Sequence, residues 1–96
     1  MAKGDIISYV GTVASGAYLD LLPSGSIEWV IHNIFHEADV ELYFYDGTNN
    51  CLVDTDSSGG GWLGFFFHCN NGKYWRIKNT NASTKMVGYD GIVSRV

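Results

Sequence analysis

Apolar residues recur along the chain in short runs, and turn-forming residues separate these runs about every ten residues. No segment combines the apolar spacing of an amphipathic helix with capping residues at both ends, and proline occurs once, at Pro23. Short runs divided by Gly, Asn, Asp and Ser are typical of β-strands and their turns. The pattern therefore predicts an all-β fold: a single compact, jelly-roll-like β-sandwich of about eight short antiparallel strands over residues 1–96.

The individual runs predict eight or nine strands in two sheets. Strands are expected at 6–13, 16–22, 27–36, 40–45, 51–54, 62–69 and 73–79, and residues 85–96 are expected to form two short strands broken at Asp90-Gly91. Asp46–Asn50 and Asn70–Gly72 predict hairpin turns, because Asp, Asn and Gly tolerate the positive φ of tight turns. In the longest run, 27–36, the residues expected to face the core are Ile27, Trp29, Ile31 and Phe35.

The run Leu42-Tyr43-Phe44-Tyr45 places large side chains on both faces of one predicted strand. A small domain normally turns a polar sheet face to water. We therefore expect the second face of this strand to be covered, either by the other sheet or by a neighbouring subunit.

The composition favours a protein that hides part of its outer surface against other proteins. Charged residues make up 17% of the 96 residues, below the usual share of about 25%, and aromatic residues make up 15%. The net charge of −4 argues against a nucleic-acid partner, because phosphate binding needs a basic surface. Acidic residues concentrate between Glu37 and Asp56, which fits either contacts between copies or a solvated surface; the clustered basic residues are Lys73, Arg76, Lys78 and Lys85.

The first ten residues lack the apolar stretch and the small-residue cleavage site of a signal peptide. No run approaches the roughly 20 apolar residues of a membrane span, so no membrane partner is expected. We therefore expect the protein to be made and folded in a cytoplasm, with Cys51 and Cys69 as reduced, buried thiols.

No pattern of catalytic or metal-binding residues stands out. Asp54–Gly59 has the oxygen spacing that begins a calcium loop, but Phe65 occupies the twelfth position, where the loop needs a bidentate Glu. His32 and His36 lie about 13 Å apart by strand rise, too far for one zinc ion, and His68 is at no ligand spacing from them. The sequence also lacks a nucleophile elbow and a phosphate loop. We predict no enzymatic activity, no metal and no cofactor.

Several aromatic residues exceed the needs of one sheet face: Tyr43, Tyr45, Trp62, Phe66, Tyr74 and Trp75. Three interpretations stay open for each of them. The ring fills the core, or it anchors a protein interface, where Trp and Tyr concentrate binding energy, or it stacks on a sugar. Trp62, which follows the glycine-rich segment 54–61, is the best candidate for a sugar platform.

Two segments carry a resemblance to a known group of proteins: "EWVIHNIFHEADVELYFYDGTNN" (28–50) and "YWRIKNTNASTKMVGYDGIV" (74–93). With "GAYLDLLP" near the start, they resemble small β-rich virion structural proteins of tailed bacteriophages, and the likeness covers nearly the whole chain. These motifs are structural rather than catalytic. The resemblance implies a capsid decoration (cement) protein or a small tail component.

The expected function follows from the resemblance and the hidden surface together. We expect a homo-oligomer, most simply a homotrimer, that binds the major capsid protein on the capsid surface of the virion and stabilises the shell. The six aromatic residues above are the candidate interface. The alternative is a glycan-binding or adaptor module of a tail fibre, spike or baseplate, with a host glycan as its partner.

Overall fold

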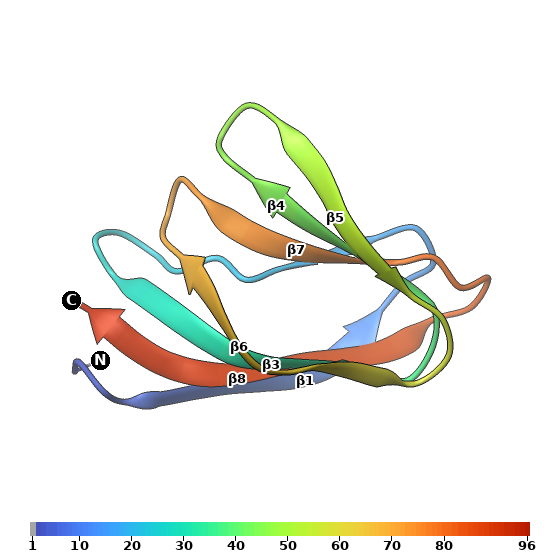
Figure 1. Cartoon of the computed structure of the whole chain (residues 1–96), viewed down its shortest axis with the longest axis horizontal. Helices are drawn as coiled ribbons and strands as arrows, with labels where there is room; N and C mark the ends of the chain where they lie inside the picture. The colour runs from blue at the N-terminus through green and yellow to red at the C-terminus, as the bar shows by residue number, and fades with distance from the viewer. Residues whose placement is uncertain (1) are drawn as a thin grey trace.

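The computed structural model describes residues 2–96, which fold into two four-stranded antiparallel sheets (Figure 1). The strands are β1 (Ile6–Val13), β2 (Tyr18–Asp20), β3 (Glu28–His36), β4 (Val40–Tyr45), β5 (Asn50–Asp56), β6 (Gly60–Cys69), β7 (Tyr74–Asn79) and β8 (Lys85–Arg95). Residues 2–96 contain no helix long and apolar enough to cross a membrane. The predicted all-β fold of antiparallel strands is confirmed.

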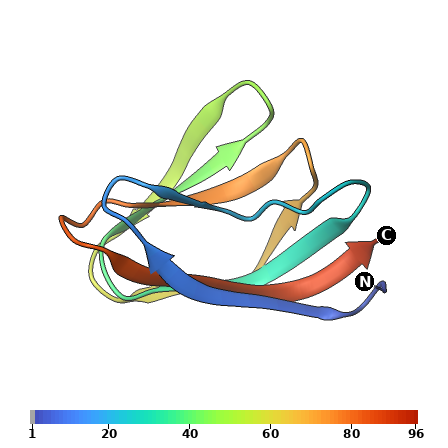
Figure 2. The same cartoon turned by 180° about the vertical axis from the view of Figure 1, so that it is seen from behind.

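The strand pairing is that of one long hairpin rolled up around the core. β4 pairs with β5, β3 with β6, β2 with β7 and β1 with β8. Two further pairings, β3 with β8 and β4 with β7, complete sheets of order β1-β8-β3-β6 and β2-β7-β4-β5. This double Greek-key order is a jelly roll. It brings the two chain ends to the same end of the molecule (Figures 1 and 2).

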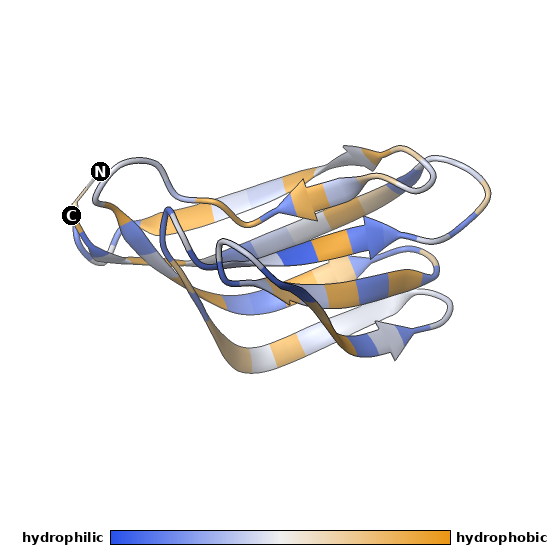
Figure 3. Ribbon diagram, turned by 90° about the horizontal axis from the view of Figure 1, so that it is seen from above, coloured by the Kyte–Doolittle hydropathy of each residue, from blue (hydrophilic) through white to orange (hydrophobic). Residues whose placement is uncertain are grey.

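The core lies between the two sheets. Hydrophobic and hydrophilic residues alternate along the strands (Figure 3), so each strand turns one apolar row inward. Fully or almost fully buried side chains come from both sheets and from the loop after β2: Leu21, Ile31, Ile34, Val40, Leu42, Ile77, Val87 and Val93. Asn79 is buried among them, and its amide is satisfied because Nδ2 donates to the carbonyl oxygens of Val13 (2.8 Å) and Ser83 (3.0 Å).

The two sheets are not parallel along their whole length. In Figure 1 they lie closest where β5 passes into β6, and they diverge toward the β4–β5 turn and the β6–β7 turn. Both turns are closed by a side chain. Asp46 Oδ1 accepts from the backbone N–H groups of Thr48 (2.9 Å) and Asn49 (2.6 Å), and Asn70 Oδ1 accepts from those of Gly72 (2.9 Å) and Lys73 (2.8 Å). The predicted hairpin turns therefore form, and they border the open end of the sandwich.

The predicted inward face of 27–36 is wrong beyond Ile31. The register of β3 shifts between Ile31 and Asn33 against both of its neighbours. Against β8, His32 is an extra residue on β3, whereas against β6 the extra residues are on β6, where residues 64–66 stand opposite His32. Such a bulge reverses the alternation that follows it. Ile34 and His36 are therefore buried, whereas Phe35 lies on the outer side of the sheet against Gly88.

The predicted break at Asp90-Gly91 is also wrong, since β8 is one continuous strand. Gly91 does not form a turn; it allows β8 and β3 to lie close together. A side chain at this position would collide with the carbonyl oxygen of Val30 on β3. The structure differs from the predicted bounds at β2, which is shorter, and at β5, which is longer.

Candidate functional site

The outer side of sheet β2-β7-β4-β5 carries a compact group of aromatic and charged residues, here called the tyrosine face: Tyr18, Asp20, Tyr43, Tyr45, Tyr74 and Arg76. The strand register puts Tyr43 opposite Arg76 and Tyr45 opposite Tyr74. The Arg76 guanidinium lies 4.0 Å from the ring centre of Tyr18, and its Nε donates to Asp20 Oδ1 at 2.7 Å. Cation–π and charge-assisted contacts thus hold Arg76 flat on this sheet.

The tyrosine face explains why strand 40–45 is large on both sides. Leu42 and Phe44 point toward the other sheet, and Tyr43 packs edge-on against Tyr18, with ring centres 5.5 Å apart. The Tyr43 hydroxyl donates to Glu41 Oε1 (2.7 Å), and this bond raises the pKa of Tyr43 to about 12. The outward tyrosines are therefore half-covered by neighbours in their own sheet, and the Tyr43 hydroxyl stays neutral and donates at ordinary pH.

The outer side of sheet β1-β8-β3-β6 is different and is here called the apolar face: Ile6, Val10, Leu63, Phe66, Met86 and Ile92. All six side chains are exposed, with Ile6 81% and Phe66 70% accessible. The register pairs Ile6 with Ile92 in one apolar row, whereas Val10 lies opposite Gly88 and Met86 opposite Thr12 in other rows. Leu63 lies opposite Asn33. A polar row runs between the apolar ones, where Asn33 Nδ2 donates to Asp90 Oδ1 at 2.6 Å.

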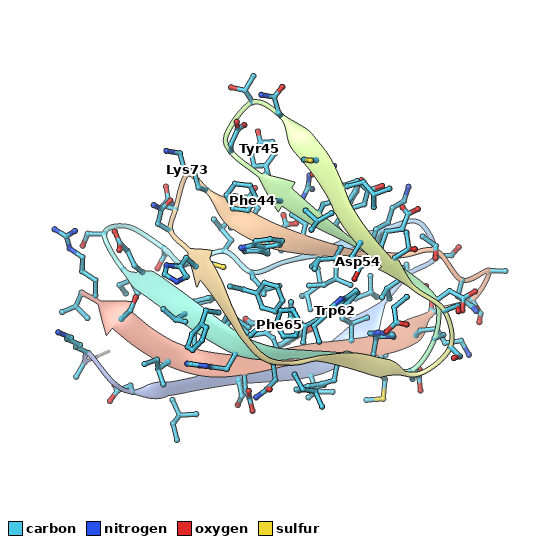
Figure 4. All side chains as sticks on the ribbon, in the orientation of Figure 1. Phe44, Tyr45, Asp54, Trp62, Phe65 and Lys73 are labelled. Carbon is cyan, nitrogen blue, oxygen red and sulfur yellow. The ribbon has the colours of Figure 1, made fainter. Side chains whose placement is uncertain are left out.

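A pocket of about 440 Å³ opens at the end where the sheets diverge. Its residues come from β3, β4, β6, β7, β8 and the β6–β7 turn: Glu28, Trp29, Phe44, Phe66, His68, Cys69, Asn70, Lys73, Trp75 and Ser94. Figure 4 shows Phe44 in the space between the sheets and Lys73 at the turn beside it. Within residues 2–96 the buried Trp29 Nε1 has no hydrogen-bond acceptor, although such a group is normally paired.

Two side-chain contacts join β5 to the inner side of the other sheet. Trp62 Nε1 donates to Asp54 Oδ2 at 2.9 Å (Figure 4). His36 Nδ1 lies 2.8 Å from the carbonyl oxygen of Ala38, and His36 Nε2 lies 2.9 Å from Asp56 Oδ2. His36 thus connects the loop before β4 to the end of β5 through its two ring nitrogens.

The six aromatic residues predicted as an interface do not share one surface. Tyr43, Tyr45 and Tyr74 come together on the tyrosine face, and Phe66 lies on the apolar face. Trp75 is half-buried and lines the pocket. Trp62 is only 8% exposed and bonds to Asp54, so the single chain presents no indole platform beside segment 54–61.

Sequence reasoning missed the apolar face and part of the tyrosine face. The signal for the first was present in strand 6–13, where Ile6 and Val10 occupy the positions that alternate with buried Ile7 and Val13. The signal for the second was Asp20 in a short alternating run, whose partner Arg76 lies on β7, the neighbouring strand in the sheet but distant in sequence. Neither is visible without the strand order.

The other candidate sites do not assemble within residues 2–96. No group of three or more His, Cys, Asp or Glu side chains is placed to hold a metal ion there. The two cysteines are unpaired. Cys69 is buried, and burial raises the pKa of its thiol to about 11, whereas Cys51 is exposed, contrary to expectation.

Comparison with known proteins identifies no relative of this chain among protein families or curated proteins: no protein-family model matches the sequence, and no curated protein matches it significantly.

Proposed function

We propose that the chain is a virion structural protein of a tailed bacteriophage, which binds the capsid as a homo-oligomer and stabilises the shell. The apolar face is the observation that supports this most. Six exposed apolar side chains lie on the outer side of one sheet, on both sides of the Asn33–Asp90 row, and apolar groups gathered on one surface mark protein interaction sites. The resemblance of segments 28–50 and 74–93 to phage virion proteins supports the same proposal.

The two outer faces suit two kinds of partner. Interfaces between permanently associated copies are more apolar than interfaces between proteins that also exist apart. The apolar face therefore fits a second copy of the chain, arranged around a symmetry axis in a homotrimer. Tyr and Arg are enriched where separately folded proteins meet, so the tyrosine face fits the major capsid protein.

The proposed action needs no turnover. Each contact of micromolar strength supplies about 8 kcal/mol, and an oligomer that engages several capsid subunits at once gains further by avidity. Stabilisation then comes from bridging seams between subunits of the shell.

The direct test uses capsids of the parent phage that lack this protein. Adding the purified protein back should raise the temperature at which these shells rupture. The variant Tyr45→Ser should weaken binding to the shells while the oligomer stays intact, because Tyr45 lies on the tyrosine face, away from the apolar one. Shells that neither bind the protein nor gain stability would contradict the proposal.

The alternative function, a glycan-binding or adaptor module of a tail fibre, predicts the opposite result in this test. In that case the protein would ignore shells and would be found with the tail in the virion. A reconstruction of the virion that places the density on the tail would support this alternative.

A further inference from the structure

We propose that the pocket between the diverging ends of the two sheets is a saccharide-binding site that prefers acidic sugars. This site is separate from the tyrosine face and does not depend on the proposed binding to the capsid. Its volume of about 440 Å³ lies within the range of roughly 300–1,000 Å³ typical of small-molecule sites.

The inner wall of the pocket is aromatic and rigid. Phe44 on β4 is paired directly across the sheet with Trp75 on β7, and their ring centres lie 5.0 Å apart. Buried Phe67 packs edge-on against Trp75 from behind, again at 5.0 Å. Both pocket rings are half-buried, so part of each stays open to a ligand. The C–H face of a sugar ring packs on such aromatic surfaces.

The polar groups around this wall are mostly hydrogen-bond donors. Lys73 is exposed and forms no ion pair among residues 2–96. Asn70 uses its side-chain oxygen to close the β6–β7 turn, which leaves its amide N–H groups for a ligand. His68 and Glu28 also line the pocket, and the Glu28 carboxylate lies 3.9 Å from Arg95 Nη1.

The combination of an aromatic wall and hydrogen-bond donors indicates the class of ligand. A ring with an apolar face and many oxygen acceptors at its edge satisfies both the aromatic wall and the surplus of donors. A carboxylate on the sugar adds a charge-assisted bond to Lys73. A nucleotide fits less well, because phosphate sites gather several cations and Lys73 is the one Lys or Arg among the described residues that line the pocket.

The test is a titration of ¹⁵N-labelled protein with short oligomers of glucose, of N-acetylglucosamine and of galacturonic acid, with adenosine monophosphate as an anionic comparison. The indole N–H signals of the three tryptophans report the location of binding. We expect the galacturonic acid oligomer to shift the signals of Trp29 and Trp75 to saturation. The signal of Trp62, which lies at the other end of the sandwich, should stay in place and serves as an internal control.

Three variants distinguish binding at this pocket from an unspecific effect. Lys73→Ala should weaken binding of the galacturonic acid oligomer by about tenfold, because it removes a charged donor. Lys78→Ala also removes one positive charge, but Lys78 lies on the outer side of the sheet, near Tyr18 and away from the pocket. This variant should therefore bind the oligomer with unchanged affinity. Trp75→Phe, with its fold checked by circular dichroism, should also weaken binding.

If only the neutral oligomers bind, the pocket is a saccharide site, but the proposed preference for acidic sugars is overturned. The proposal as a whole is overturned if no saccharide moves the Trp29 and Trp75 signals. Equal affinities in Lys73→Ala and Lys78→Ala, or tighter binding of adenosine monophosphate, would overturn it as well. None of these results bears on shell binding, so the two proposals fail separately.

Discussion

At the scale of single residues, side chains with two partners fix the shape of this protein more than isolated contacts do. Asp46 closes the β4–β5 turn through two backbone N–H groups, and Arg76 both pairs with Asp20 and lies on the ring of Tyr18. His36 joins the loop before β4 to the end of β5. Each of these residues connects segments that the jelly-roll order brings together from distant parts of the sequence.

The turn at Asp46 predicts a dependence of stability on pH. The bonds from Asn49 and Thr48 lower the pKa of Asp46 in the folded protein below its ordinary value of 3.8. A group whose pKa is lowered on folding stabilises the protein above its unfolded value, and this stabilisation is lost as the pH falls through the lower, folded value. Asp46→Ala should therefore melt a few degrees below wild type at pH 7, and the difference should shrink at pH 2. A difference in melting temperature that is the same at both pH values would contradict this role of Asp46.

The two thiols should react at very different rates. Cys51 is exposed, whereas Cys69 is buried with its thiol pKa raised to about 11. Because the thiolate is the reactive form, an alkylating reagent at pH 8 should modify Cys51 quickly in the folded protein and Cys69 only after unfolding. Mass spectrometry of partly labelled protein measures this directly. Equal labelling of both cysteines in the native state would show that the region around Cys69 opens.

At the scale of elements, the strands and turns could be predicted from the sequence. Which residues of a strand face the core and which face outward could not be predicted throughout. Alternation and turn residues locate β1, β3, β4, β6 and β7 within about two residues of their bounds. The bulge at His32 leaves no such signal, because one extra residue in β3 reverses the inward face without changing the composition of the run. Trp62 shows the same limit: it is buried in the core, and its indole N–H donates to Asp54, which lies on the other sheet.

Close contact between β8 and β3 makes a further prediction at this scale. Gly91 has no room for a side chain, while Gly16, with φ of +78°, has open space around it. Gly91→Ala should therefore cost about 3 kcal/mol or more by forcing the strands apart. Gly16→Ala should cost only about 1 kcal/mol, which reflects its backbone conformation. Chemical denaturation of the two variants compares these values, and a smaller loss for Gly91→Ala than for Gly16→Ala would be inconsistent with this packing.

Strand β5 should be the least protected strand of its sheet. It is the edge strand beside β4, and most of its residues are exposed. Its side-chain links to the other sheet are Trp62 with Asp54 and His36 with Asp56. The double variant Asp54→Ala, Asp56→Ala should therefore speed hydrogen exchange in β5 while central β3 stays protected. Unchanged exchange in β5 would mean that backbone pairing with β4 alone holds it.

At the scale of the whole molecule, the jelly roll turns two unlike faces outward and one pocket toward an open end. The tyrosine face is already half-covered by its own rings and by the Arg76–Asp20 ion pair, so water meets a polar and aromatic surface there. The apolar face has less internal cover: Phe66 packs against the His32 ring, yet Ile6, Leu63 and Phe66 are each more than half exposed. The account of this protein as an oligomeric virion component therefore depends on what covers the apolar face.

Sedimentation velocity of the purified protein is the most direct test of that claim. Wild-type protein should sediment as an oligomer, with three copies expected, over a range of concentrations. The double variant Leu63→Ser, Phe66→Ser removes apolar side chains from the exposed face without touching the core and should sediment as a folded monomer. The matched variant Tyr45→Ser, on the other sheet, should keep the oligomer. Wild-type protein that stays monomeric at every concentration, with the apolar face open to water, would contradict the account.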